Sequence, residues 1–188
     1  MKNPAGFTLI ELLAVIAIIA IMSTLLFPQI GRFQDRARSI VCVNNLRQVG
    51  VGVLAYLGEN NYEYPIIEPN PQNPVYLPNA SGDPTEIEAK PMLEVLGQYG
   101  VNDAVLQCPA DIKGDNWYAK NIPHTSYQWR VMLDGENANS AKIYGGRRGY
   151  GVRIVNPSRV TICTDYERVH GSKMNRLYAD GHVSKPNY

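Results

Sequence analysis

The chain has 188 residues, of which 45% are hydrophobic and 19% are charged, and its formal net charge is +1. This length holds one modest globular domain in addition to one membrane segment. The near-zero net charge argues against nucleic-acid binding, which normally requires a basic domain or patch.

A membrane-length apolar segment runs from Phe7 to Phe27. Its 21 residues include one charged side chain, Glu11, and a short polar leader with Lys2 precedes it. As an α-helix it would cover roughly 30 Å, the hydrocarbon thickness of a bilayer. The alternative is a removable signal peptide, whose apolar region is usually about 7–15 residues and ends at an A-x-A-like site. The longer run, without such a site, predicts a retained transmembrane helix.

The basic residues near this segment are distributed unevenly. Lys2 precedes the segment, and Arg32, Arg36 and Arg38 follow it. The positive-inside rule alone would therefore keep the C-terminal part of the chain in the cytoplasm.

The helical pattern continues beyond Pro28, which is expected to kink the helix rather than end it. An amphipathic spine helix is predicted over 29–58, ending near Gly58. Gly50 and Gly52 weaken this helix by up to about 1 kcal/mol each relative to Ala, so packing must stabilise that turn. The apolar positions recur at three- and four-residue spacing: Ile40, Val43, Leu46, Val49, Val53 and Leu57.

Residues 59–188 are predicted to form a globular head. The many prolines in 62–91 predict an extended surface loop with, at most, short strand pieces, and Pro91 to Gly100 predicts a short helix. Short β-branched and aromatic runs bounded by turn formers predict strands. These runs are Tyr127–Leu133, Tyr150–Val155, Val160–Thr164, and a hairpin of Met174–Ala179 with His182–Lys185 through Asp180-Gly181. The predicted class is α+β, with a long N-terminal helix packed on a small, mostly antiparallel β-sheet with long loops.

The N-terminal hexapeptide Gly6-Phe7-Thr8-Leu9-Ile10-Glu11, with its basic leader and Pro28, resembles the type IV pilin and type II secretion pseudopilin superfamily. In that family a prepilin peptidase cuts after the glycine, and the new N-terminal phenylalanine is N-methylated. The resemblance implies a leader peptide at 1–6, a cut between Gly6 and Phe7, and a transmembrane and assembly helix at 7–28. It further implies that the Glu11 carboxylate meets the Phe7 amine of a neighbouring subunit. The alternative for Glu11 is an interfacial residue that reaches the lipid headgroups.

Three further motifs resemble one bacterial branch of that superfamily. They are Cys-x-Asn-Asn-Leu-Arg-Gln at 42–48, Cys-Pro-x-Asp at 108–111, and His170 followed after nine residues by Asp180-Gly181. The role of this branch is inherited from the superfamily.

Three cysteines leave several pairings open. Because Cys42 and Cys108 fall within these motifs, a bridge between them would join the spine to the head and close a loop of 66 residues. The chain-entropy treatment gives such a loop roughly 4 kcal/mol. A Cys108–Cys163 bridge and three unpaired thiols are the alternatives, and the sequence does not choose.

A metal site is not expected from His170, Asp180 and His182. Asp180-Gly181 is better explained as a turn, with the histidines bonded to nearby backbone. No dense run of oxygen ligands suggests calcium, although some pseudopilins bind calcium in the head, so that cofactor stays open. No local pattern resembles a nucleophile site, and enzymatic activity is not expected.

The resulting hypothesis is a prepilin-like structural subunit of a bacterial inner membrane. It would be single-pass, with an extracytoplasmic head, and family precedent would override the positive-inside count. Its partners would be copies of itself or other pilin-like subunits in a pseudopilus or pilus-like fibre, together with the prepilin peptidase. The alternative is a singly membrane-anchored extracytoplasmic binding protein that does not polymerise and uses aromatic segments such as Trp117-Tyr118 and Tyr127–Trp129.

Overall fold

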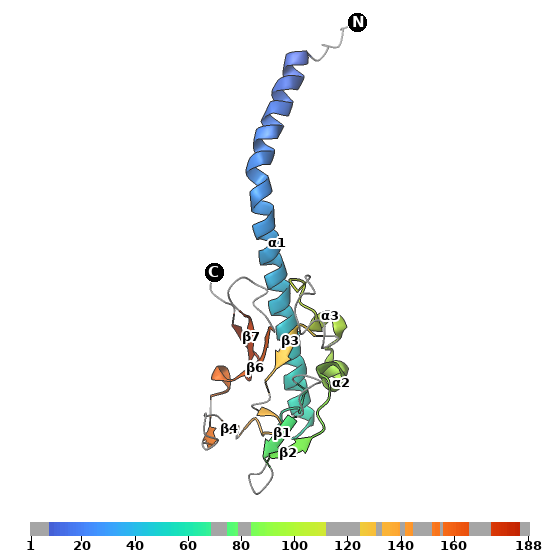
Figure 1. The fold of residues 1–188 in the computed structure, drawn as a ribbon, viewed down its shortest axis with the longest axis vertical. Helices are drawn as coiled ribbons and strands as arrows, with labels where there is room; N and C mark the ends of the chain where they lie inside the picture. Colours follow the sequence, from blue (N-terminus) through green and yellow to red (C-terminus); the bar gives the residue numbers. More distant parts are fainter. Residues whose placement is uncertain are drawn as a thin grey trace. The chain divides into compact units, whose positions relative to one another are not determined.

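The computed structural model describes residues 8–68, 75–78, 84–111, 125–130, 133–139, 142–144, 152–154, 156–165 and 174–184. The chain divides into two compact units, an N-terminal unit (1–37) and a head unit (38–188). Figure 1 shows the elements in chain order.

Helix α1 (Leu9–Glu59) is 51 residues long and continues through Pro28, as predicted. It ends where Asn61 and Tyr62 adopt positive φ angles of 53° and 62°. The Tyr62 N–H donates to the Leu57 carbonyl at 2.9 Å, which satisfies one of the last helical acceptors. The stop therefore comes from a left-handed turn rather than from Gly58, because asparagine tolerates this conformation better than most residues.

The other elements of the described chain are short. They are β1 (Val75–Pro78), β2 (Pro84–Ile87), α2 (Met92–Leu96), η1 (Gly97–Tyr99), α3 (Asp103–Leu106), β3 (Tyr127–Trp129), β4 (Lys142–Tyr144), β5 (Val152–Ile154), η3 (Pro157–Arg159), β6 (Thr161–Asp165), β7 (Arg176–Tyr178) and β8 (Val183–Ser184). The predicted helix after Pro91 is present as α2 and η1, which end at Gly100 with φ +86°. Strand β5 lies within the predicted run Tyr150–Val155, and β1 and β2 are strand pieces within the predicted loop 62–91. The pairing of these strands into hairpins, the strand β4 and the helix α3 were not predicted.

The main sheet has four antiparallel strands in the order β3-β6-β7-β8. In β6, Cys163 is paired with Trp129 of β3 on one side and with Leu177 of β7 on the other, so β6 has a neighbouring strand along both of its edges. Asp180-Gly181 joins β7 to β8, and Gly181 has the positive φ of 84° that this turn requires.

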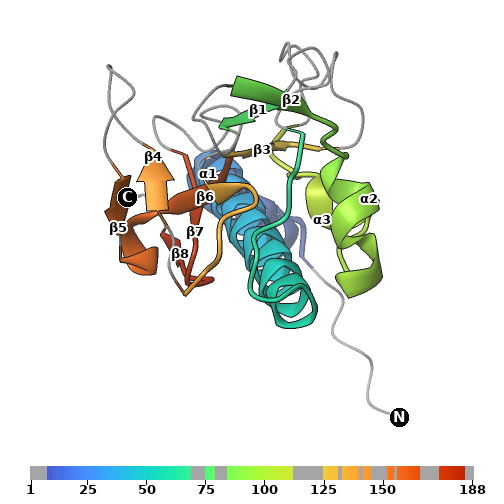
Figure 2. The same ribbon diagram turned by 90° about the horizontal axis from the view of Figure 1, so that it is seen from below.

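In the head unit, α1 lies between this sheet and the short helices α2 and α3 (Figure 2). The predicted stripe of α1 is buried: Val43, Leu46, Val49, Val53 and Leu57 are at most 4% exposed. Ile40 departs from the prediction, because half of its surface remains exposed.

Two glycines allow the close approach on both sides of α1. A Cβ at Gly50 would lie 2.9 Å from Leu177 Cδ1, and one at Gly52 would lie 2.7 Å from Val101 Cγ2. The glycines that weaken the helix are thus the positions where the sheet and the α2–α3 side approach it. The predicted α+β class, with a long helix packed on a small antiparallel sheet, is confirmed.

Candidate functional site

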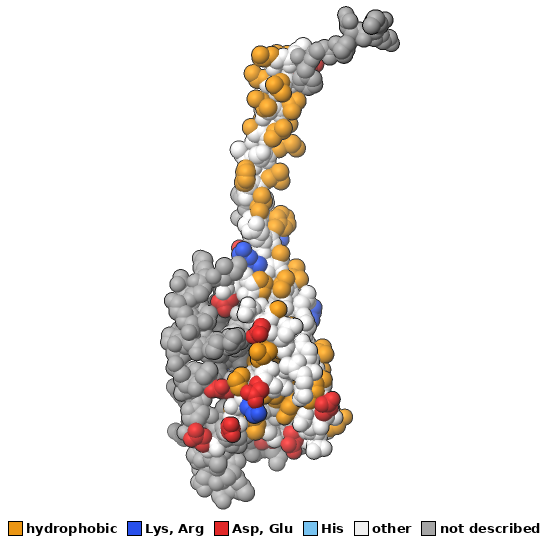
Figure 3. Space-filling model, turned by 90° about the vertical axis from the view of Figure 1, so that its right-hand side faces the viewer, with side chains coloured by type: hydrophobic (Ala, Val, Ile, Leu, Met, Phe, Trp, Pro, Cys, Tyr) orange, Lys and Arg blue, Asp and Glu red, His pale blue; other side chains and the backbone are white. Residues whose placement is uncertain are grey.

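The N-terminal half of α1 presents apolar side chains in all directions. Every large hydrophobic side chain described between Leu9 and Phe33 is 46% to 82% exposed. Figure 3 shows these side chains along the helix. A contiguous apolar surface of this length needs lipid or other apolar helices around it.

Two hydroxyl side chains inside this segment donate hydrogen bonds to the backbone of the helix itself. Ser23 Oγ donates to the Ile19 carbonyl at 2.7 Å, and Thr24 Oγ1 donates to the Ile21 carbonyl at 2.8 Å. Hydroxyls bonded to the preceding turn add no unpaired polar group to an apolar surface. The segment is therefore compatible with a hydrocarbon environment.

Glu11 closes the start of α1 through a capping box. The Thr8 N–H and the Thr8 hydroxyl donate to Glu11 Oε2 at 2.9 Å and 2.7 Å, and the Glu11 N–H donates to Thr8 Oγ1 at 3.4 Å. This capping box was not predicted, although the T-x-x-E spacing is its usual signal in a sequence. Glu11 thus has a structural role besides any role in assembly.

Length and composition single out two apolar stretches in the described part of α1. Gln29–Glu59 is long enough to span a membrane, and Leu9–Thr24 is a shorter apolar helix. Half of the apolar window in Gln29–Glu59 is buried within the protein, and Arg36, Arg38 and Arg47 lie in that stretch. A stripe that forms the core of the head unit cannot face lipid as well, so we assign the membrane contact to the N-terminal stretch.

Cys42 on α1 and Cys108 after α3 form a disulfide, one of the pairings that the sequence left open. Cys163 in β6 is a buried free thiol. The Tyr127 hydroxyl, close by, donates to the Cys42 carbonyl at 3.5 Å. The bridge fixes the α3 end of the head to the spine.

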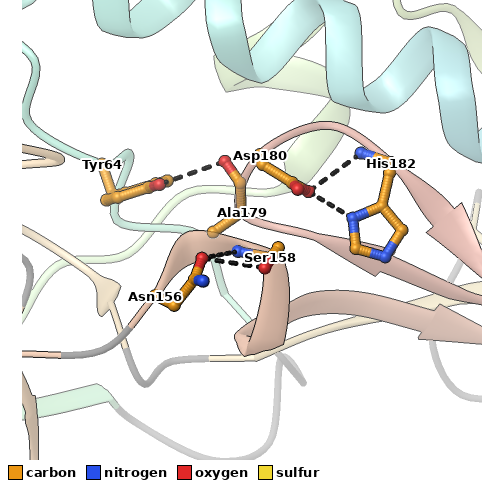
Figure 4. Close-up of polar contacts among 6 residues, drawn as sticks. All are labelled: Tyr64, Asn156, Ser158, Ala179, Asp180 and His182. Carbon is orange, nitrogen blue, oxygen red and sulfur yellow. Dashed lines mark hydrogen bonds and ion pairs between the residues drawn. The ribbon is translucent and has the colours of Figure 1, made fainter.

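The Asp180-Gly181 turn packs on α1. A Cβ at Gly181 would lie 3.1 Å from Leu54 Cδ1, and the turn also reaches Tyr64, whose hydroxyl donates to the Ala179 carbonyl at 3.3 Å. In Figure 4 the Asp180 carboxylate points at both the backbone nitrogen and the ring of His182. The motif therefore holds the last hairpin against the spine.

The charge of Asp180 is stabilised within the turn. Burial alone would raise the pKa of this carboxyl, but the hydrogen bonds from the His182 backbone N–H and ring outweigh it and hold the pKa below its usual value. The His182 ring stacks on Tyr178, with ring centroids 4.2 Å apart and planes at 6°. Nearby, Asn156 Oδ1 accepts from the Ser158 N–H and hydroxyl and caps η3 (Figure 4).

Two buried carboxyl groups lie within the head core. Trp129 Nε1 donates to Asp134 Oδ1 at 2.7 Å, and the Asn175 N–H donates to Asp165 Oδ2 at 2.8 Å. Within the described chain, the second oxygen of each carboxyl has no hydrogen-bond partner. Burial raises the pKa of each to about 7. No sequence signal identified these acids, because each lies inside a strand or turn whose burial depends on the tertiary fold.

The predicted site residues belong to different parts of the chain. Glu11 and Pro28 lie in α1, Cys42 and Cys108 form the bridge, and the 180–181 turn lies in the head unit. Gly6, Phe7 and His170 lie outside the described residues.

Two expectations about ligands can be compared with the described residues. No group of three His, Cys, Asp or Glu side chains in them could hold a metal ion. The expectation that Tyr127–Trp129 offers an aromatic binding surface is wrong, because Tyr127 and Trp129 are each 1% exposed and belong to the core. Trp117 and Tyr118 lie outside the described residues.

Residues 1–27 match the prokaryotic N-terminal methylation motif. A search of curated proteins and a search of solved structures each find no match to this chain. The motif covers the predicted leader, the predicted cut and the first part of α1. It supports a relation to the pilin and pseudopilin family, and with the apolar helix it is consistent with a single membrane anchor.

Proposed function

We propose that this chain is a prepilin-like structural subunit that is cut between Gly6 and Phe7, N-methylated at Phe7, and assembled through α1 into a fibre. The fibre would be a type II secretion pseudopilus or a type IV pilus-like filament. One observation carries the proposal: a methylation motif at 1–27 leads into a helix whose apolar side chains are exposed all round. The resemblance of 42–48, 108–111 and 170–181 extends the proposal to the bacterial branch with a C-terminal His-x9-Asp-Gly motif.

The disulfide supports an extracytoplasmic head. Disulfides persist in oxidising compartments and are rare in the cytoplasm. The Cys42–Cys108 bridge lies on the C-terminal side of the proposed membrane segment. We therefore place the head outside the inner membrane, although the positive-inside rule applied to the basic residues after the segment would place it in the cytoplasm. The proposed partners are the prepilin peptidase and other pilin-like subunits. We propose no enzymatic role.

The capping box suggests how Glu11 could take part in assembly. Both bonds that Glu11 accepts from Thr8 end on Oε2, so they hold the carboxylate at the start of the helix. Cleavage after Gly6 would create a charged amine one residue before Thr8. In an apolar surrounding, opposite charges gain most when each is the other's partner.

The experiment combines mass spectrometry of the mature N-terminus with filament purification for four chains: the parent, Glu11→Ala, Glu11→Gln and Thr8→Ala. We expect a methylated Phe7 in all of them and filaments only from the parent and Thr8→Ala. Gln preserves a capping box but carries no charge, whereas Thr8→Ala loses the cap, at about 1 kcal/mol, and keeps the charge. Parent-like filaments from Glu11→Gln would show that Glu11 acts only as a cap. An uncut parent that forms no filaments would exclude the proposed function.

A second candidate is a singly anchored extracytoplasmic binding protein that does not polymerise. A pocket of about 520 Å³ in the head unit, lined mainly by polar side chains, favours it. It predicts that the parent stays monomeric after gentle detergent extraction, as measured by sedimentation.

A further inference from the structure

The pocket lies at the C-terminal end of α1. Tyr56, Glu59 and the turn that follows form one part of its lining, and the segment leading into α2 forms another. Four glutamates line it against a single lysine: Glu59, Glu63, Glu88 and Glu94, with Lys90. Its lining is therefore strongly acidic, although the whole chain is almost neutral.

Among the described residues, two of these carboxylates have hydrogen-bond or ion-pair partners and two have none. Lys90 Nζ lies 2.7 Å from Glu94 Oε1, and Glu59 Oε2 accepts from the Tyr99 hydroxyl at 2.8 Å. Glu63 and Glu88 are exposed and make no side-chain hydrogen bond or ion pair to the described residues. The hydrogen bond from Lys90 to Glu94, followed by the charges of Glu94 and Glu88, raises the pKa of Lys90, so the pocket already stabilises one cation.

The lining of the pocket also offers apolar surface. Tyr56, Ile66 and Val95 line the pocket and are half-buried. A fitting partner therefore combines a positive charge with exposed apolar side chains.

Such a surface lies on α1 of the same chain. We call it the outer stripe: Ile40, Arg47, Val51 and Leu54. Spacings of seven, four and three residues put all four on one helical face. The three apolar members are 50%, 64% and 46% exposed. Arg47 is exposed, and among the described residues its guanidinium donates one hydrogen bond, from Nη1 to Asn44 Oδ1 at 3.1 Å. Most of its five N–H groups therefore remain for an acceptor on another copy.

Arg47 cannot reach the pocket of its own chain. Tyr56, the first pocket residue on α1, is nine residues further along, which is about 14 Å along the helix axis. This exceeds the reach of one side chain, so any pairing of the two surfaces joins two copies.

We propose that the outer stripe of one copy docks at the acidic pocket of a second copy, with the Arg47 guanidinium bound by Glu63 and Glu88. The inference rests on the proposed function and names a contact between heads in the fibre. The two surfaces are different patches of one chain. Such a heterologous contact repeats into an open fibre when its rotation does not close a ring, whereas a contact of one patch with itself gives a closed dimer.

The test uses two full-length chains with reversed charges. The first carries Glu63→Lys and Glu88→Lys, and the second carries Arg47→Glu. Each alone places like charges in the contact, which disfavours docking, so we expect filament yield to fall at least about tenfold. Expressed together, the two chains can pair a positive pocket with a negative stripe and the reverse, so we expect mixed filaments. Glu86→Lys, an exposed charge change on β2 outside the pocket, is the matched control and should leave the yield unchanged.

Two results would overturn the contact. One is parent-like yield from each reversed chain alone, which removes the contact and leaves the proposed function intact. The other is a mixture of the two chains that yields no more filaments than either chain alone, although both chains have the same unfolding midpoint as the parent. If a reversed chain unfolds early, the neutral variant Glu63→Gln with Glu88→Gln replaces it, and parent-like filament yield from that variant overturns the contact. A parent that never forms filaments excludes the proposed function, and the contact with it.

Discussion

Two stretches of one helix, residues 9–33 and residues 39–57, are both rich in apolar side chains but differ in burial. In the first, the large apolar residues are exposed on all sides, whereas in the second a stripe at three- and four-residue spacing is at most 4% exposed. Both stretches also contain polar or charged residues: Glu11, Ser23, Thr24, Gln29 and Arg32 in the first, and Ser39, Asn44, Asn45, Arg47 and Gln48 in the second. Apolar content alone therefore does not determine what a helix packs against. Its periodicity decides whether the partner lies on one side or all round.

The largest expected effect separates the two stretches directly. Leu46→Ala removes a fully buried side chain of α1 and should lower the free energy of unfolding of the head by about 2–5 kcal/mol. Ile16→Ala, in the exposed stretch, should leave it unchanged. Urea unfolding of the full chain in detergent, followed by the fluorescence of buried Trp129, measures both variants. Equal losses would show that the two stretches are not energetically distinct.

The buried acids of the head give a second difference, in pH dependence. The pKa values of Asp134 and Asp165 are raised to about 7, whereas an unfolded aspartate titrates near 3.9. Between about pH 4 and pH 7 the folded head keeps these protons and the unfolded chain has lost them. The stability that these two groups contribute should therefore be fully present below about pH 4 and fall across this window, by on the order of 1 kcal/mol per pH unit for each group.

Asp134→Asn tests the source of this slope. An asparagine can still accept the hydrogen bond from Trp129 Nε1 but does not titrate. Urea midpoints measured from pH 4 to pH 8 should show a flatter profile in the variant than in the parent. Parallel profiles would show that the pKa of Asp134 is not raised, and a steeper profile would contradict the assigned sign.

Periodicity and turn chemistry predicted much of this fold. The buried stripe of α1 follows from the spacing of Val43, Leu46 and Val49, and the last hairpin follows from Asp180-Gly181. Strand β5 lies within the run Tyr150–Val155 that predicted a strand, and β1 and β2 lie in the loop where short strand pieces were expected. Their pairing into hairpins and the strand β4 were not predicted, because runs of three or four residues carry too little pattern.

The candidate site was predictable only where one local pattern carries it. The predicted cut and Glu11 lie within six consecutive residues, and the capping box is equally local, although it was not predicted. The choice among three cysteines and the acidic pocket depend on segments brought together from distant positions. The pocket is formed by the end of α1 and by residues about thirty positions later in the chain. No residue spacing in the sequence predicts that these two segments lie close together.

The smallest expected effect concerns glycines within the buried stretch of α1. Gly52→Ala would place a Cβ 2.7 Å from Val101 Cγ2, a stiff side chain that is 1% exposed, so the neighbours must shift. We expect a loss of about 1–2 kcal/mol, measured by the same urea unfolding. Gly58→Ala meets no atom within 4 Å and should stabilise by up to about 1 kcal/mol, because alanine favours the helix. If Gly52→Ala lowers stability while Gly58→Ala raises it, the packing of Val101 determines that residue 52 is a glycine. A gain at both positions would show that helix propensity outweighs the approach of Val101.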